Sequence, residues 1–155
     1  IRNHLAASDG MTLKACQTMN YPISGGNIEH FKEFVKTKSK EAPQYGLTEE
    51  EGKKLAKKYG ANVDQLFHYA TEADGRLTPF VYAQLIYSMK HEMVVKPVDF
   101  FIRRTGSLYF DIHWVHQWKD QVLEVMREQM NWTDEAAQQM KTELEQELHY
   151  AVTPV

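Results

Sequence analysis

The sequence contains a single cysteine, Cys16, so no disulfide can form within the chain. A chain without disulfides is typical of a reducing compartment, and we expect the protein to work in the cytoplasm. No apolar run approaches the roughly 20 residues that a membrane-spanning helix needs. The opening segment, IRNHLAASDG, also lacks the apolar core of a secretory signal peptide. Because the first residue is isoleucine, we expect the chain to be a piece of a longer protein.

The sequence also lacks an excess of basic residues. Its 18 lysines and arginines stand against 21 aspartates and glutamates, which gives a net charge of −3. A general nucleic-acid binder needs a basic excess to displace counterions, so we expect no nucleic-acid partner. With 155 residues, of which 43% are hydrophobic and 25% charged, the chain has the composition of one globular domain with its own core.

Apolar residues repeat at helical spacing along most of the chain, between recognisable start and stop signals. Two of the start signals are specific. Thr48 followed by Glu51 forms a capping box, and Thr78 is followed by proline at the first helical position. The helix starts that we predict are Asn27, Thr48, Asn62, Thr78, Asp111 and Thr133, with a short helix from Pro97 through Arg104 and stops at Gly60, Gly75 and Gly106.

The sequence therefore predicts an all-α fold, a compact array of about five to six helices joined by short loops. The segment TLKACQTMNYPISGG has no helical period and is typical of an extended N-terminal lead-in that ends in a turn rich in proline and glycine. We divide the chain into this lead-in, residues 1–26, and a helical domain, residues 27–155. No βαβ alternation is visible.

Charge is distributed unevenly along the helices. Eight lysines and six glutamates lie between Ile28 and Gly60, whereas eight acidic and two basic residues lie between Asp120 and His149. Solvated helix faces explain such blocks, but a docking surface for another domain or for a membrane would show the same pattern. One alternative function is therefore a helical module that binds a protein partner or a membrane surface and has no link to catalysis.

Three short patterns could carry chemistry. The stretch PISGGNIEHF places two glycines before a helix, but it has no phosphate-loop signature and no firm strand before it, so we predict a turn with a helix cap. His113, His116 and Asp120 share one side of a helix, but a metal site needs three or four convergent ligands, and we predict no metal. Cys16 has no evident activating base nearby.

Arg103 and Arg104 end the apolar segment KPVDFFIRRTG. At helical spacing, apolar side chains fall on two sides of this segment, so an arginine buried there needs a carboxylate partner. The alternative is a small-molecule site in which the two guanidinium groups hold a phosphate. We favour the structural interpretation, and the candidate partners are Asp99, Glu92, Glu72 and Asp111.

Three segments in this order, PISGG, YGLTEEEGKKLAKKYGANVDQLF and HEMVVKPVDFFIRRTGSLYFD, resemble the C-terminal helical domain of bacterial FAD-dependent (aerobic) glycerol-3-phosphate dehydrogenases. The related α-glycerophosphate oxidases share this domain. The resemblance runs from about Thr12 to about Met130. The family pattern, an acidic residue and then proline or leucine, D-F, a hydrophobic residue and R-R-T, falls on Glu92, Pro97, Asp99, Phe100, Phe101, Arg103, Arg104 and Thr105.

The resemblance implies a piece of a flavoenzyme that oxidises sn-glycerol 3-phosphate to dihydroxyacetone phosphate and passes the hydride to FAD. The FAD fingerprint GxGxxG is missing from this sequence, as are the family's substrate-domain strands. The resemblance therefore implies no catalytic, cofactor-binding or metal-binding residue here, and no FAD bound to this piece. The lead-in at 1–26 would come from the missing FAD domain, and 27–155 would be the C-terminal cap domain.

The resemblance also implies partners and a location. The partner would be the N-terminal FAD and substrate domain of the same protein, and the helical domain could contribute to a homo-oligomer. Family members work in the cytoplasm, often at the inner face of the cell membrane, where the parent protein would be peripheral. We give the motif residues a structural role as an ion-pair knot, and they are Glu92, Asp99, Arg103, Arg104 and Thr105.

Overall fold

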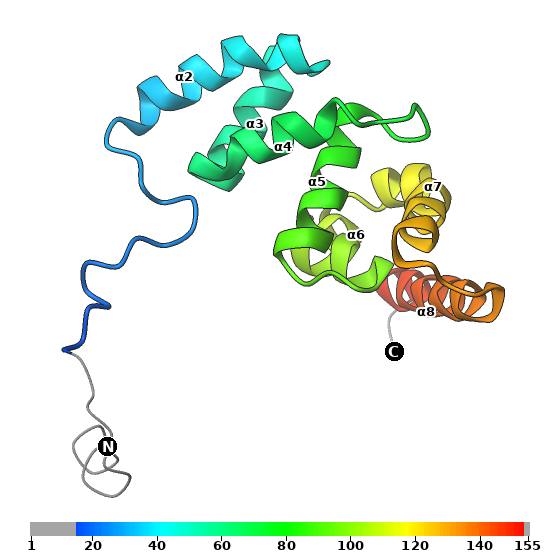
Figure 1. Cartoon of the computed structure of the whole chain (residues 1–155). Helices are drawn as coiled ribbons and strands as arrows, with labels where there is room; N and C mark the ends of the chain where they lie inside the picture. The colour runs from blue at the N-terminus through cyan, green and yellow to red at the C-terminus, as the bar shows by residue number, and fades with distance from the viewer. Residues whose placement is uncertain (1–14, 154–155) are drawn as a thin grey trace, which may run out of the picture.

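A computed structural model of the protein describes residues 15–153, and within this range the chain forms helices, turns and loops without a strand (Figure 1). The predicted all-α class is confirmed over these residues. The predicted lead-in before Ala15, and Pro154 and Val155, lie outside the described residues. The helices are α2 (Phe31–Glu41), α3 (Glu49–Tyr59), α4 (Val63–Ala70), α5 (Pro79–His91), α6 (Ser107–Phe110), α7 (Ile112–Met130) and α8 (Asp134–Val152), with 3-10 turns η1 (Ala42–Tyr45) and η2 (Gly60–Asn62) and a π-helical turn η3 (Asp99–Arg104).

Four predicted helix starts coincide with side-chain caps. The Thr48 hydroxyl accepts a hydrogen bond from the Glu51 amide at 3.2 Å, and the Glu51 carboxylate accepts one from the Thr48 amide at 2.8 Å, which completes the capping box. Thr78, Asp111 and Thr133 each accept a hydrogen bond from the amide three residues later. These contacts satisfy amides that have no partner inside their own helix.

The first helix starts later than Asn27, where we predicted its cap. α2 begins at Phe31, and His30 stands at the cap position without a side-chain hydrogen bond. The amide of Ile28 donates to the Gly26 carbonyl at 3.0 Å, so the chain is still turning at the predicted start. This turn contacts the end of α3 through the Gly25 carbonyl, and that tertiary contact outweighs the local helix signal.

The third helix also differs from the prediction at its ends. Asn62 precedes α4, but its side chain makes no hydrogen bond to the helix. The helix ends at Ala70 and not at Gly75. The reason is local, because the Thr71 hydroxyl donates to the His68 carbonyl at 2.7 Å and competes with continued helix.

α5 is the central helix and joins two hydrophobic cores. Ala83 and Tyr87 belong to the first core, which α2, α3 and α4 complete. Leu85 and Ile86 belong to the second core, to which η3, α6, α7 and α8 contribute. Eight of the 13 residues of α5 are buried, because the helix is covered from two directions.

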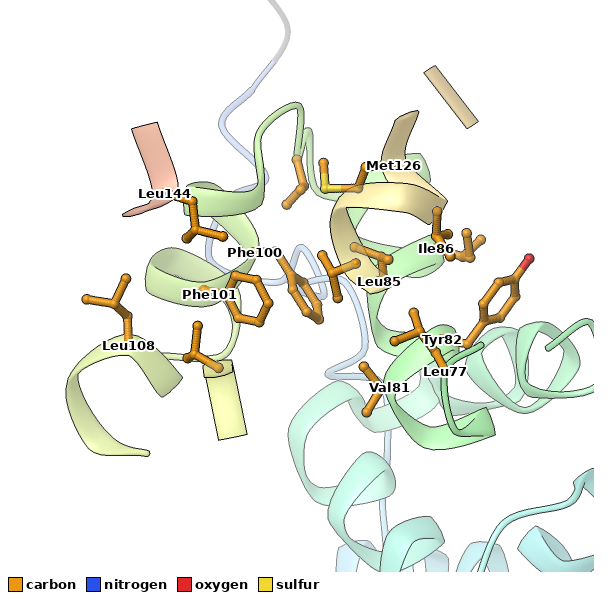
Figure 2. Packing of buried hydrophobic residues seen from close by; sticks show 14 of the residues in the cluster. Leu77, Val81, Tyr82, Leu85, Ile86, Phe100, Phe101, Leu108, Met126 and Leu144 are labelled. Atoms are coloured by element: carbon orange, nitrogen blue, oxygen red, sulfur yellow. The ribbon is translucent and has the colours of Figure 1, made fainter. Parts of the chain in front are cut away.

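The second core is built around two adjacent phenylalanines. Phe100 and Phe101 are both fully buried, and their ring centroids lie 5.3 Å apart. Figure 2 shows them between Leu85 of α5 and Leu144 of α8. Trp114, in the first turn of α7, meets Phe101 edge to face with the centroids 5.9 Å apart. Full burial of one phenylalanine side chain contributes about 1.5–3 kcal/mol to folding.

α7 and α8, with 19 residues each, are amphipathic. Val115, Val122 and Met126 are fully buried and form the apolar stripe of α7. At the surface, the Lys119 ammonium lies 3.7 Å from the Glu145 carboxylate of α8. Within residues 15–153, no helix combines the length and the apolar content needed to cross a membrane.

Candidate functional site

The motif with two arginines and two carboxylates lies between α5 and α6, around η3. Asp99 opens η3, and only 12% of its side chain is exposed. Its carboxylate accepts hydrogen bonds from the amides of Val95 and Lys96, at 3.4 and 3.2 Å, and pairs with the Arg103 guanidinium. The Arg103 side chain is 69% exposed. Asp99 therefore orders the loop before η3, while most of Arg103 faces solvent.

Arg104 joins the end of η3 to the end of α5. Its Nε lies 3.3 Å from a carboxylate oxygen of Glu92, and its Nη2 donates to the backbone carbonyl of Glu92. The two side chains are 34% and 29% exposed, so solvent screens this pair less than a fully exposed one. Within the described part of the chain, the buried Nε has no acceptor in hydrogen-bond geometry, so its contact with Glu92 is an ion pair only.

The two arginines thus bind separate carboxylates, Asp99 and Glu92. The other two candidate partners have different roles. Glu72 lies 3.6 Å from His68, and Asp111 caps α7. A bidentate phosphate site would instead need guanidinium groups that are free to converge on one anion.

η3 is a π-helical turn, whereas an ordinary helix was predicted from Pro97 to Arg104. The Thr105 amide donates to the Phe100 carbonyl, five residues earlier, at 2.9 Å. The Thr105 hydroxyl lies 3.1 Å from the carbonyl oxygens of both Phe100 and Phe101, and it accepts from the Ser107 amide at 3.2 Å. Thr105 therefore closes a π-helical turn. Such turns are rare in proteins and are frequently found at functional sites.

Lys58 of α3 brings a further positive charge toward the motif. Its ammonium donates to the Gln84 side-chain carbonyl at 3.1 Å, and the Gln84 amide donates to the Phe80 backbone carbonyl at 3.2 Å. Burial lowers the pKa of Lys58, the Glu92 carboxylate opposes this shift, and Arg104 adds to it. Lys58 thereby links α3 to a buried polar group of α5.

A groove of about 270 Å³ lies beside this contact, between α3 and the start of α7. Lys54 and Lys58 stand on the α3 side, and Ser107 and Asp111 stand on the other. The Asp111 carboxylate accepts the Trp114 amide at 3.1 Å, so it adds a negative charge to that wall. The groove offers mixed charge and not the purely positive lining that favours an anion.

The glycine-rich segment PISGG docks on the end of α3. The Gly25 carbonyl accepts a hydrogen bond from the Ala61 amide at 2.9 Å, and the Asn62 side-chain amide donates to the Ser24 hydroxyl at 2.8 Å. A turn at Ser24–Gly25, as predicted, is confirmed. Its glycines serve a contact between two backbone segments, because Gly60 lies directly against Gly25.

The histidines of α7 and Cys16 are surface groups. His113, His116 and Asp120 are all exposed, and no three His, Cys, Asp or Glu side chains of residues 15–153 are placed to hold one metal ion. Cys16 is exposed, and its sulfur lies 2.9 Å from the Thr18 hydroxyl, whose hydrogen bond lowers the pKa of the thiol.

Two long-range contacts were not predicted from the sequence. One is the Lys58–Gln84 contact between α3 and α5. The other joins Arg76, in the loop before α5, to Glu128 of α7 with an N–O distance of 2.6 Å, and Arg76 also pairs locally with Asp74 at 2.6 Å. Partners that are 26 or 52 positions apart leave no periodic signal in a sequence, so only the fold brings them together.

Known proteins match this chain along most or all of its length. A family model for the C-terminal domain of alpha-glycerophosphate oxidase matches residues 16–137. The aerobic glycerol-3-phosphate dehydrogenase of Bacillus subtilis (strain 168) is 39% identical over 163 residues, which cover 100% of this chain and 29% of that protein. The enzyme of the same name from Staphylococcus epidermidis (strain ATCC 12228 / FDA PCI 1200) is 39% identical over 142 residues, which cover 88% of this chain and 26% of that protein.

A solved structure matches the fold. The X-ray structure of the glycerol-3-phosphate dehydrogenase from Bacillus halodurans complexed with FAD superimposes with a TM-score of 0.89 and 38% sequence identity, over 99% of this chain and 32% of that one. The chain spans less than a third of the length of each of these relatives. The resemblance seen in three sequence segments is thereby confirmed, and the chain belongs to the family of the C-terminal domain of alpha-glycerophosphate oxidase.

Proposed function

We propose that this chain is the non-catalytic, C-terminal helical domain of a FAD-dependent enzyme that oxidises sn-glycerol 3-phosphate to dihydroxyacetone phosphate in glycerol catabolism. One observation carries the proposal. The Bacillus halodurans dehydrogenase, whose structure is complexed with FAD, contains a counterpart of 99% of this chain, and that counterpart is only 32% of its length. The remainder of such a protein would bring the flavin and the substrate.

The described residues of this chain do not fit an FAD site. A dinucleotide cofactor is typically held at the edge of a parallel sheet by a glycine-rich turn that leads into a helix. Residues 15–153 contain no strand, and the one glycine-rich turn of the lead-in packs on α3. We therefore assign this chain no catalytic residue and derive no step of the reaction through the flavin.

We give the five residues of the motif a structural role. Each arginine has its own carboxylate, and the turn between the two ion pairs carries two fully buried phenylalanines. Release of Arg104 to a phosphate would leave the partly buried Glu92 carboxylate without its partner, which is costly. These contacts support a motif that holds η3 against α5. Its members are Glu92, Asp99, Arg103, Arg104 and Thr105.

The partner of the domain would be the N-terminal FAD and substrate domain of the same protein, in the cytoplasm. The described part of the lead-in supports contact with a partner. Met19, Tyr21 and Ile23 lie within five residues and are 94%, 75% and 83% exposed. Figure 1 shows this segment leading away from the helices. Large apolar side chains grouped in this way commonly mark a surface that another domain covers.

The proposal is tested by dye reduction that depends on glycerol 3-phosphate, with the purified chain and added FAD. We expect no turnover from a chain whose circular dichroism spectrum is helical. The full-length Bacillus subtilis dehydrogenase, assayed alongside, serves as the positive control. Turnover by the 155-residue chain would overturn the non-catalytic assignment, because it would require a flavin site within these residues.

A further inference from the structure

α2 and α3 enclose a second groove, with a volume of about 380 Å³. Its apolar floor is the buried side chain of Val35, and Ser39 and Glu49 form part of the lining. Lysines dominate the rest. They are Lys32, Lys36 and Lys40 along α2 and Lys53 from α3.

The three α2 lysines have no carboxylate within ion-pair distance among the residues that the structure describes. Lys53 does have one, the Glu50 carboxylate at 3.6 Å. Lys38, on a neighbouring face of the same helix, lies 2.8 Å from the Glu41 carboxylate and 2.7 Å from that of Asp64. Within the described residues, α2 therefore neutralises Lys38, which lies outside the groove lining, and leaves its three groove lysines without an ion-pair partner, while Glu49 is the one carboxylate in the lining.

Helix stability explains only Lys40 in this arrangement, because Lys40 stands in the last turn of α2, where the helix dipole favours a positive charge. Like charges four residues apart repel on a helix surface, and Lys32, Lys36 and Lys40 form two such pairs in succession. Lys32 also stands in the first turn of α2, where the helix dipole disfavours a positive charge. A bound anion would relieve both kinds of repulsion.

The lining indicates the class of anion. An ammonium group binds an anion as a compact point charge, and several ammonium groups around one groove favour an anion with several charges, such as a molecule with more than one phosphate group, over a single carboxylate. The Cβ atoms of lysines one turn apart are separated by about 6 Å, so the long side chains of two such lysines can reach one molecule with two or more phosphate groups. The net charge of −3 disfavours a nucleic acid. We propose that the α2–α3 groove binds a small molecule with two or more phosphate groups. This site is separate from the arginine motif around η3.

The test is calorimetric titration of the 155-residue chain with sodium tripolyphosphate at low ionic strength. We expect binding by the unmodified chain, and affinity at least about tenfold lower for K32E/K36E. The matched control is K54E/K57E, which changes the net charge equally on α3 but lies outside the groove lining, and it should keep most of the affinity. The neutral variant K32Q/K36Q should show an intermediate loss, and far-UV circular dichroism checks that every variant is folded.

Three outcomes would overturn the proposal. Equal losses in both charge-reversal variants would mean that net charge, and not the groove, attracts the anion. Inorganic phosphate that binds as tightly as tripolyphosphate would remove the requirement for two or more phosphate groups. Absence of tripolyphosphate binding would reject the site. In that case the chain would be tested with vesicles of phosphatidylcholine and phosphatidylglycerol. Vesicle binding by the unmodified chain that is absent from K32E/K36E would mean that the lysines serve a membrane surface instead.

Discussion

The carbonyl oxygen of Gly25 lies where a side chain on Gly60 would begin. A Cβ on Gly60 would stand 2.0 Å from that oxygen, and a Cβ on Gly25 would stand 2.4 Å from the Tyr59 carbonyl oxygen. Both glycines also have positive φ, +56° at Gly60 and +80° at Gly25. The lead-in is therefore joined to the end of α3 by a backbone contact that requires glycine on both sides.

Replacement Gly60→Ala should lower the free energy of unfolding by about 1–3 kcal/mol, because the new methyl group meets a backbone oxygen and the positive φ becomes strained. Urea denaturation followed by far-UV circular dichroism measures the loss. Gly75→Ala is the matched control, because Gly75 has φ +94° but nothing within 4 Å of its Cβ position. Equal losses at the two positions would show that the contact with Gly25 adds nothing to backbone strain.

Arg104→Met should destabilise the chain by about 1.5–3 kcal/mol, because it leaves the partly buried Glu92 carboxylate without a partner and removes the bond to the Glu92 carbonyl. Arg103→Met should cost less than about 1 kcal/mol, because Arg103 is mostly exposed. Thermal unfolding of the two variants side by side makes the comparison. If Arg103→Met were the more damaging change, the structural role given to the Glu92–Arg104 pair would be wrong.

Lys58 should make the free energy of unfolding depend on pH in the alkaline range. Burial lowers its pKa from the ordinary 10.5, so the folded chain loses this proton at a lower pH than the unfolded chain does. The unfolded state then binds more protons in that window, and stability rises with pH. The unfolding free energy of the unmodified chain relative to Lys58→Met should therefore increase as pH approaches 10.5 from below. Lys57→Met, at an exposed position of the same helix, accounts for the change in net charge. A flat or falling difference would contradict the prediction.

Arg76→Gln should lower the melting temperature at neutral pH, because Arg76 holds the loop before α5 against Glu128 of α7. Its hydrogen bonds lower the pKa of both Asp74 and Glu128. A carboxyl group with a lowered pKa contributes stability above its unfolded pKa and loses that contribution as pH falls through the folded pKa. The difference between variant and unmodified chain should therefore shrink in acid.

Arg127→Gln serves as the control for Arg76→Gln, because Arg127 pairs with Asp134 only seven positions away across the α7–α8 turn. We expect a smaller drop in melting temperature for this variant. A difference at Arg76 that stayed constant down to strongly acidic pH would mean that its effect comes from packing and not from the two carboxylates.

Several parts of the fold were predictable because they depend on neighbours in the chain. Thr48 with Glu51, and Thr78 before Pro79, satisfy amides within four residues, so the sequence alone locates these starts. The apolar stripe of α7 was predictable for the same reason, since residues three or four apart share one face. The predictions at Asn27 and Gly75 were wrong, because a contact with the end of α3 holds the first segment and the Thr71 hydroxyl ends α4 early.

The sequence by itself determined the all-α class, most helix starts and the family, because caps, periodicity and short motifs are local properties of the chain. It also placed Asp99 and Arg103 one turn apart. Only the tertiary structure decided that Arg104 returns to Glu92, that Lys58 reaches Gln84 and that four lysines from two helices line one groove. These contacts depend on how α5 is covered from two sides, and packing between distant segments leaves no period that a sequence can display.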